Sequence, residues 1–197
     1  MVKLARQVIE NKLGLAAKPE TIDDPVLAEK CGVFVTLNVH VRGAYGLRGC
    51  IGLPYPSKPL IDAVIEAAES SAFHDPRFPP VQAGEMKGLT IEISVLTPPE
   101  RLDVDNPIDY PNHVQVGRDG LIIGKGWRRG LLLPQVPVEW GWDSREFLSQ
   151  CCVKAGLPQD EWRKPDTEIY RFQAILFKEV EPQGKVIRHK IDKEYKL

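Results

Sequence analysis

A guanidinium and a thiol stand on either side of one glycine in the hexapeptide Leu47–Gly52, LRGCIG. Small neighbours leave the sulfur of Cys50 approachable, and the adjacent charge of Arg48 favours its thiolate, the nucleophilic form of cysteine. The alternative is that Cys50 is a small buried hydrophobe and that Gly49 and Gly52 let two backbones approach closely. The hexapeptide is therefore a candidate centre for chemistry or for binding.

A nucleophilic thiol also needs a general base, and the sequence offers His40 and His74. His74 precedes Asp75, whose carboxylate could orient the imidazole. The members of a catalytic triad meet in space and need not be neighbours along the chain. The sequence therefore leaves the identity of the base open.

An acid and a guanidinium stand two residues apart in Asp75-Pro76-Arg77-Phe78, on a loop that prolines stiffen. This arrangement suits an oriented anion clamp that uses Arg77. The alternative is a structural salt bridge between Asp75 and Arg77 that holds the loop.

Further polar candidates occur on a predicted strand and after a later apolar run. Glu92 interrupts an alternating strand, where acids are disfavoured, so it is a candidate general acid or base facing a cleft. The alternative is a solvated strand residue. Gln135 and Glu139 follow Leu133 on a proline-kinked segment and could point into the same crevice, although surface positions explain them equally well.

The segment Gly124–Gly130 is a basic turn that contains Trp127. Such a turn could contact a phosphate or a stacked base, whereas a hairpin tip is usually basic for solubility. It lacks the Gly-Lys-Ser/Thr ending of a phosphate-binding P-loop. The turn is therefore a secondary candidate for a partner.

The composition excludes several classes of protein. Lys and Arg number 26 against 27 acids, so no global basic field draws this chain of 197 residues onto nucleic acid. The longest apolar runs fall far below the ~18 residues that span a bilayer, and the N-terminal segment has no signal-type cleavage pattern. We therefore expect a soluble, cytoplasmic protein without a membrane partner. The four cysteines lack paired CxxC spacing, which predicts free thiols and no metal site.

Strands and a helix are predicted to position these candidates. The period of two over Gly32–Val41 predicts a strand, and Leu47–Leu53 is predicted to pair back on it, since glycines in the connection permit a tight reversal. Helical spacing of apolar residues predicts a helix over Leu60–Phe73, ending where the proline-rich loop begins. Leu89–Thr97 alternates again and places Glu92 on the polar face.

Beyond Pro98 the pattern changes. Residues Pro98–Asn112 are rich in proline and acids, which predicts a crossing segment between two lobes. Asp143, with Glu146 three residues on, resembles a capping box and predicts a helix, and Glu168–Glu181 is predicted to be a central strand. Short apolar runs predict a meander of three strands: His113–Gly117, Leu121–Gly124 and Leu131–Leu133.

These elements predict an α+β fold in a single domain over residues 1–197, with a mixed or antiparallel sheet flanked by helices. The larger lobe is predicted to contain about residues 1–97 and 143–190, and a smaller β-rich lobe about residues 98–142. The candidate site would lie in a cleft between the two lobes.

The chain resembles the AMMECR-domain family, named after a human chromosomal-region protein linked to Alport syndrome, mental retardation, midface hypoplasia and elliptocytosis. LRGCIG, the sequence DPRFPP at Asp75–Pro80, and Leu132–Val136 followed by Glu139 and Trp142 carry the resemblance, which covers almost the whole chain. It implies a compact α+β protein with two lobes and no established reaction. Its motif positions carry over to Arg48, Gly49, Cys50, Gly52, Asp75, Arg77, Phe78 and Glu139.

The chain also departs from the family pattern. The histidine before the D-x-R-F loop, here His74, is not part of that pattern, which argues against a pair with Cys50. Some relatives carry a glutamate where this chain has Gln135. The resemblance therefore indicates which residues form the site, but it does not indicate which reaction or ligand the site serves.

Two functions fit these observations. In the first, a cytoplasmic enzyme holds a small polar or anionic molecule: Arg48 and Arg77 bind charge, Cys50 supplies the thiolate, and Asp75 with Glu92 orients groups or moves protons. The predicted ligand-binding set also includes Gly49, Gly52, Gln135 and Glu139. In the second, the chain is a non-catalytic regulatory or binding module for a small ligand, a protein or nucleic-acid machinery. The near-neutral charge argues against broad phosphate contact, and the sequence implies no particular cofactor.

Overall fold

The computed structural model describes residues 1–20, 24–41 and 44–189. Within them, residues 1–96 and 175–189 form a first unit, and residues 97–174 form a second. Both units combine helices with antiparallel strands, so the predicted α+β class is confirmed.

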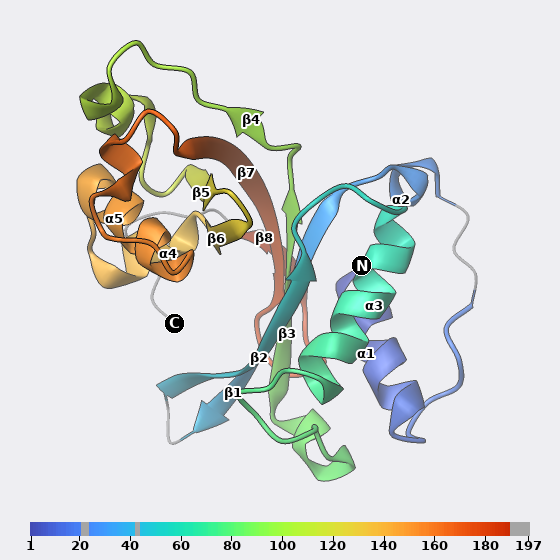
Figure 1. Cartoon of the computed structure of the whole chain (residues 1–197). Coiled ribbons are helices and arrows are strands. Elements are labelled where there is room, and N and C mark those ends of the chain that lie inside the picture. Colours follow the sequence, from blue (N-terminus) through green and yellow to red (C-terminus); the bar gives the residue numbers. More distant parts are fainter. Residues whose placement is uncertain (21–23, 42–43, 190–197) are drawn as a thin grey trace. The chain divides into compact units, whose positions relative to one another are not determined.

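The first unit contains the predicted hairpin (Figure 1). Strand β1 (Gly32–Val41) pairs antiparallel with β2 (Ala44–Leu53) on one edge and with β3 (Leu89–Leu96) on the other. The strand order continues to β7 (Glu168–Glu179), whose C-terminal part also pairs with β8 (Val186–His189). Strand β2 is therefore an edge strand of this sheet.

Two helices cover one face of this sheet. Helices α1 (Val2–Lys12) and α3 (Leu60–Phe73) lie side by side, with α3 packed on β1 and β2 (Figure 1). The bounds of α3 are those predicted from the helical spacing of its apolar residues. The short helix α2 (Pro25–Ala28) and the 3-10 helix η1 (Ala83–Lys87) lie in the connections.

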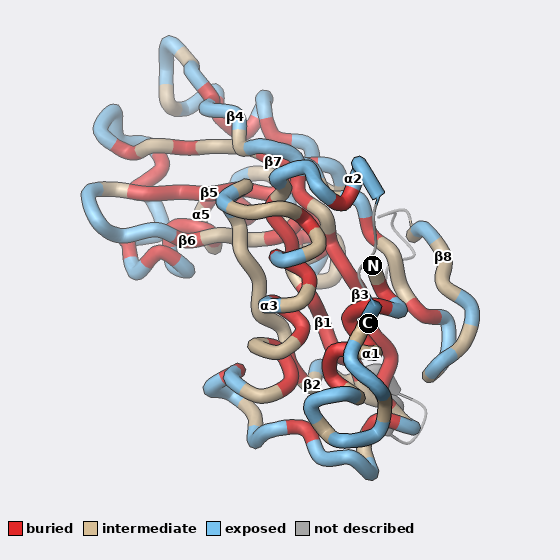
Figure 2. Tube along the Cα trace, turned by 90° about the vertical axis from the view of Figure 1, so that its right-hand side faces the viewer, coloured by how far each residue is buried: buried red, intermediate tan, exposed pale blue. Residues whose placement is uncertain are grey.

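Strands β1 and β3 are buried on both faces, as their colours in Figure 2 show. The face towards the helices is apolar and each of its side chains is at most 1% exposed: Val33, Val35, Leu37, Leu89, Ile91 and Ile93. The opposite face is polar and also buried: Thr36, Asn38, Thr90, Glu92 and Ser94. A buried polar sheet face is uncommon, because each polar group there needs a hydrogen-bond partner.

The second unit is built around the N-terminal part of β7. Strand β7 pairs with β5 (Asp119–Lys125), which pairs with β6 (Arg128–Leu132), and with the short β4 (Glu100–Arg101). Helix α5 (Ser144–Lys154) packs on β5 and β6. The core of the second unit includes Leu121, Ile123, Phe147, Leu148, Cys151, Trp162 and Ile169. The 3-10 helices η2 (Pro107–His113) and η3 (Glu161–Arg163) complete this unit, with α4 (Gln135–Trp140).

The structure corrects two local predictions. The run His113–Gly117 is not a strand, because the Asp119 carboxylate accepts a hydrogen bond from the Gln115 backbone N–H and closes a turn there. The segment from Gln135, predicted to be kinked by its prolines, is the regular helix α4. Pro134 is its N-cap and Pro137 lies in its first turn, where a missing N–H leaves no intrahelical bond unmade.

The second unit extends past α4. It continues to Ala174, because Phe147, Leu148 and Cys151 on α5 pack into its core. The predicted bounds of the two lobes and the predicted cleft between them stay predictions.

Candidate functional site

The hexapeptide lies on edge strand β2, and a bulge separates its two halves. Gly49 pairs with Leu37 of β1, whereas Leu47 pairs with Asn38, so Arg48 has no opposite residue. A bulge re-aims the side chain it carries. The period of two used in the sequence analysis therefore does not determine where Arg48 points.

The two glycines of the motif have a packing role. A Cβ atom at Gly49 would overlap the carbonyl oxygen of Ser71 on α3, and one at Gly52 would overlap the Phe34 ring. At both positions the backbone of β2 lies close to a neighbouring element. This is what we expect if the glycines of the motif serve packing. Gly49 and Gly52 thus permit the approach of other elements, whether or not they also bind a ligand.

Side chains of α3 and the following loop bond to the backbone of β2. The Ile51 N–H donates to Ser71 Oγ (2.9 Å), which donates to the Val35 carbonyl oxygen (2.7 Å). The Cys50 N–H donates to Asp75 Oδ2 (2.8 Å). These bonds satisfy donors that an edge strand would otherwise expose.

The predicted ion pair between Asp75 and Arg77 is present. Arg77 Nε lies 2.9 Å from Asp75 Oδ1, and its NH2 lies 2.7 Å from Oδ2 and 3.1 Å from the Cys50 carbonyl oxygen. Hydrogen bonds from the Arg77 guanidinium lower the pKa of Asp75 to about 2. The Asp75 side chain is 2% exposed and that of Arg77 is 51% exposed. Asp75 is therefore a fixed anion that positions a half-exposed cation.

Arg48 has a partner that the sequence analysis missed. Its Nε lies 2.8 Å from Glu85 Oε1 and its NH2 3.1 Å from Oε2, while Glu85 Oε2 also accepts from the Gln82 N–H (2.7 Å). The Arg48 guanidinium is the main cause that lowers the pKa of Glu85. Glu85 stands three residues after Gln82, which is the spacing of a capping box. This spacing could have predicted the start of η1 and the fixed position of Glu85.

The Phe78 ring lies near both guanidiniums, 5.9 Å from Arg48 Cζ and 5.5 Å from Arg77 Cζ. Among the described residues, Arg48 NH1 is buried without a hydrogen-bond partner. Both arginines are paired with a carboxylate, but the Arg48 side chain is 11% exposed and that of Arg77 is 51% exposed, so Arg77 is the more available of the two cations that were predicted to bind charge.

Cys50 and Glu92 lie in one row across the polar face of the sheet. Cys50 pairs with Thr36, and Thr36 pairs with Glu92 on the other side of β1. Thr36 Oγ1 lies 3.3 Å from Cys50 Sγ. Burial raises the pKa of the Cys50 thiol; Thr36 and Arg77 oppose this rise, whereas Glu92 and Asp75 add to it. Cys50 is therefore a protonated thiol at neutral pH.

Two polar side chains next to the row of Cys50, Thr36 and Glu92 each have one buried atom without a hydrogen-bond partner among the described residues. Asn38 and Ser94 stand two residues to either side of the Thr36–Glu92 pair. In the part of the chain that the structure describes, Asn38 Oδ1 and Ser94 Oγ are buried and have no hydrogen-bond partner. The sequence showed the alternation of apolar and polar residues in these strands. Such alternation normally predicts that the polar face is exposed to solvent, so it did not reveal that this face is buried.

The remaining predicted residues lie elsewhere. Gln135 and Glu139 are on α4 of the second unit, where Gln135 is 5% exposed. His74 is exposed at the C-terminal end of α3, and the side chain of His40 lies outside the described residues. Neither histidine is thus placed beside Cys50 as a base. The described residues contain no group of three or more His, Cys, Asp or Glu side chains that could hold a metal ion.

The basic turn between β5 and β6 has most of its charge paired. Arg129 NH2 lies 2.6 Å from Glu168 Oε2, and Lys125 Nζ lies 2.6 Å from Glu161 Oε1. Trp127 is 88% exposed, with the Arg128 guanidinium 5.5 Å from its ring. Paired cations reduce the attraction of this turn for a phosphate backbone.

The polar face of β1 and β3, with the clamp of Asp75 and Arg77 beside it, defines an α+β protein with a candidate small-molecule site. The sequence model of the AMMECR1 family matches residues 2–177. The chain therefore belongs to the AMMECR1 family, as its motifs predicted.

Relatives and a solved structure agree with this assignment. The chain is 55% identical over 181 residues to a protein of Methanothermobacter thermautotrophicus, covering 91% of this chain and 92% of the relative. It is 53% identical over 191 residues to a protein of Thermococcus gammatolerans, with 95% and 93% covered. The crystal structure of the uncharacterized protein PH0010 from Pyrococcus horikoshii has a TM-score of 0.89 at 52% identity, covering 96% of this chain and 94% of that chain. These names state no activity.

A search of the described residues for a helix long and apolar enough to cross a membrane finds none.

Proposed function

We propose that the first unit binds a small, negatively charged polar molecule at the polar face of β1 and β3 beside the hexapeptide, and acts on it as an enzyme. The observation that carries this proposal is the pair of orphaned atoms, Asn38 Oδ1 and Ser94 Oγ, on that buried face. An unsatisfied buried polar group costs about 1–3 kcal/mol. A ligand that bonds to these atoms offsets that cost.

Arg77 supplies the positive charge of the proposed site. Its side chain is half exposed, and Asp75 holds its guanidinium against the Cys50 carbonyl oxygen. A pre-positioned guanidinium loses less conformational freedom on binding a carboxylate or phosphate than a free one does. Asp75 is thus a positioning residue, and its low pKa argues against the predicted role in proton transfer.

Proton transfer by Glu92 is the chemistry that this set of residues supports best. Glu92 is 4% exposed and lies in the same cross-strand row as Cys50. Cys50 has a raised pKa, so covalent chemistry first requires loss of its proton at an energetic cost. We therefore assign Glu92 as general acid or base and Cys50 as a neutral contact of the ligand.

A non-catalytic binding module is the second candidate function. It is favoured by the raised pKa of Cys50 and the lowered pKa of Asp75, which argue against proton transfer by two of the three predicted catalytic residues. The binding surface is the same in both cases. Only turnover distinguishes the two functions.

The test is a thermal-shift screen of small carboxylates and phosphates, followed by calorimetry on each compound that binds. We expect Arg77→Gln and Ser94→Ala each to weaken binding about tenfold, since each removes a hydrogen-bonding group. Arg101→Gln removes the same charge from an exposed pair with Asp103 in the second unit and serves as the control. Equal affinities in all four proteins would refute the proposed site.

Turnover is then measured by NMR on the same compounds. Enzymatic action predicts that Glu92→Gln retains binding but loses conversion of the ligand. Binding without conversion in the native protein would leave the binding module as the function.

A further inference from the structure

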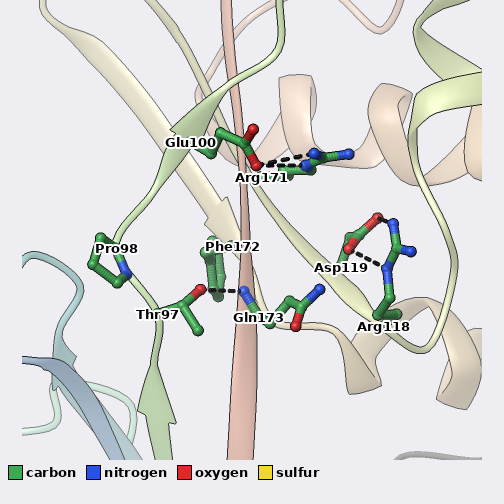
Figure 3. A pocket seen from close by; sticks show the side chains of 8 residues that line it. All are labelled: Thr97, Pro98, Glu100, Arg118, Asp119, Arg171, Phe172 and Gln173. Atoms are coloured by element: carbon green, nitrogen blue, oxygen red, sulfur yellow. Dashed lines mark hydrogen bonds and ion pairs between the residues drawn. The ribbon is translucent and has the colours of Figure 1, made fainter.

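A small pocket lies within the second unit, where β4 and β5 pair with opposite edges of β7 (Figure 3). Its volume is about 190 Å³. Two arginines, two carboxylates and two neutral polar side chains line it: Arg118, Arg171, Asp119, Glu100, Thr97 and Gln173. None of these residues belongs to the site on the first unit.

Arg118 is held in place by a buried carboxylate. Its Nε and NH2 lie 2.8 Å and 2.7 Å from the two oxygens of Asp119, which also accepts from the Gln115 N–H at 2.9 Å. The Asp119 side chain is fully buried, whereas that of Arg118 is 45% exposed. Within the described residues, Arg118 NH1 makes no hydrogen bond. Asp119 therefore fixes Arg118, whose side chain stays half exposed, with one guanidinium nitrogen not bonded to Asp119.

Arg171 is held less tightly. Its Nε (3.0 Å) and NH2 (2.9 Å) both bond to one oxygen, Oε2, of Glu100 on the neighbouring strand. The Glu100 side chain is 66% exposed, so solvent screens this ion pair and makes it weak. Glu100 can therefore leave Arg171 at little cost when another anion arrives.

Neutral donors complete the lining. The Gln173 backbone N–H donates to Thr97 Oγ1 at 2.8 Å, which leaves the Thr97 hydroxyl proton free to donate in turn. The side-chain amide of Gln173 adds two further N–H donors, and Figure 3 shows it between the two arginines and Thr97. Donors from three strand segments thus converge on one small volume.

We propose that this pocket binds the oxyanion group of a small molecule, a phosphate or a carboxylate, between Arg118 and Arg171. Guanidinium groups bond to these anions through two parallel N–H donors, which is the geometry that a fixed Arg118 offers. The pocket is smaller than the ~300–1,000 Å³ of typical sites for drug-sized ligands. It therefore selects a compact anion, and Glu100 acts as the built-in competitor that the anion displaces from Arg171.

The experiment is calorimetric titration of the full chain at about 0.15 M salt, where diffuse surface attraction is largely screened. One arm uses inorganic phosphate and the other uses malonate, so that the two sources of the oxyanion are distinguished. We expect saturable binding in one arm. Arg171→Gln should weaken it about tenfold or more, because a hydrogen bond to a charged group is lost. Glu100→Gln should tighten it about twofold to fivefold, because a competing carboxylate is removed.

Arg129→Gln is the matched control, because it removes the same charge from an exposed pair with Glu168 elsewhere in the second unit. It should leave affinity within about twofold, since a surface pair outside the pocket has little effect on it. The titrations are repeated in the Arg77→Gln background, which removes the charge of the site proposed on the first unit, so that the binding that remains is assigned to this pocket.

Three results would overturn the proposal. They are the absence of saturable binding in both arms, an equal loss in Arg129→Gln and Arg171→Gln, and weaker binding in Glu100→Gln. Loss of binding in Arg77→Gln would place the anion on the first unit instead.

Discussion

A buried ion pair in the first unit gives the sharpest test of how its helices and strands are joined. Arg6 on α1 bonds to Glu179 at the end of β7, with Nε 2.7 Å from Oε1 and NH2 2.5 Å from Oε2. Arg6 also donates to the carbonyl oxygens of Leu89 (2.6 Å) and Met86 (3.2 Å), and Glu179 Oε2 accepts from the Ile91 N–H (3.0 Å). One side-chain pair thus links α1, β3 and β7.

The charges of this pair persist despite burial, since the two side chains are 8% and 2% exposed. Burial lowers the pKa of Arg6, but the hydrogen bonds and charge of Glu179 outweigh it, so the pKa is raised overall. Arg6→Met keeps an aliphatic stem but leaves a buried carboxylate and two carbonyl oxygens without their donor. Removing one member of a buried pair costs about 3–5 kcal/mol. We expect a loss of that size in the free energy of unfolding.

Urea unfolding with linear extrapolation measures this loss. Lys12 lies on α1, like Arg6, and forms an exposed pair with Glu69 on α3; Lys12→Ala is therefore the control and should change stability by less than about 1 kcal/mol. The double variant Arg6→Met with Glu179→Met should regain much of the loss, because no buried charge is left unpaired. A loss below about 1 kcal/mol for Arg6→Met would refute the reasoning, because the pair would then not be buried as described.

Three further predictions concern the hexapeptide and its neighbours. Gly49→Ala should destabilise the fold by about 1–3 kcal/mol in urea unfolding, since its Cβ would overlap the Ser71 carbonyl oxygen, whereas Gly84→Ala, with open space around it, should not. Asp75 has a pKa lowered to about 2 in the folded chain, so its contribution, about 2 kcal/mol, is present above pH ~4 and lost as the pH falls through about 2. Urea midpoints from pH 2 to 6 should therefore fall less steeply with acid in Asp75→Asn. Because Glu92 raises the pKa of Cys50, Glu92→Gln should speed iodoacetamide labelling of Cys50 at pH 8 in a Cys31→Ser background; slower labelling would contradict that electrostatic account.

Periodicity predicted the elements of the first unit well because their cores obey it. Strands β1 and β3 alternate apolar and polar residues over most of their length, and α3 carries its small and apolar residues at helical spacing, so local sequence and tertiary packing agree there. In the second unit, local signals conflicted with the fold. Pro134 and Pro137 predicted a kinked segment after Leu133, but the same residues begin a helix, and no periodicity in so short a segment distinguishes the two structures.

In the candidate site, too, contacts between sequence neighbours could be predicted, whereas contacts that depend on the fold could not. Asp75 and Arg77 are two residues apart, so their pairing was accessible from the sequence, whereas the partner of Arg48 lies 37 positions away at Glu85 and depends on a bulge. Register also decides the setting of Cys50. It stands opposite Thr36, whose own neighbour across the sheet is Glu92, and this buried acidic setting holds the cysteine as a thiol. The adjacent arginine in the sequence suggested the reverse, a stabilised thiolate. Because Glu85 pairs with Arg48, while burial and the groups on β1, β3 and the loop after α3 set the state of Cys50, the chemistry of the hexapeptide depends on other elements and not on its own sequence neighbours.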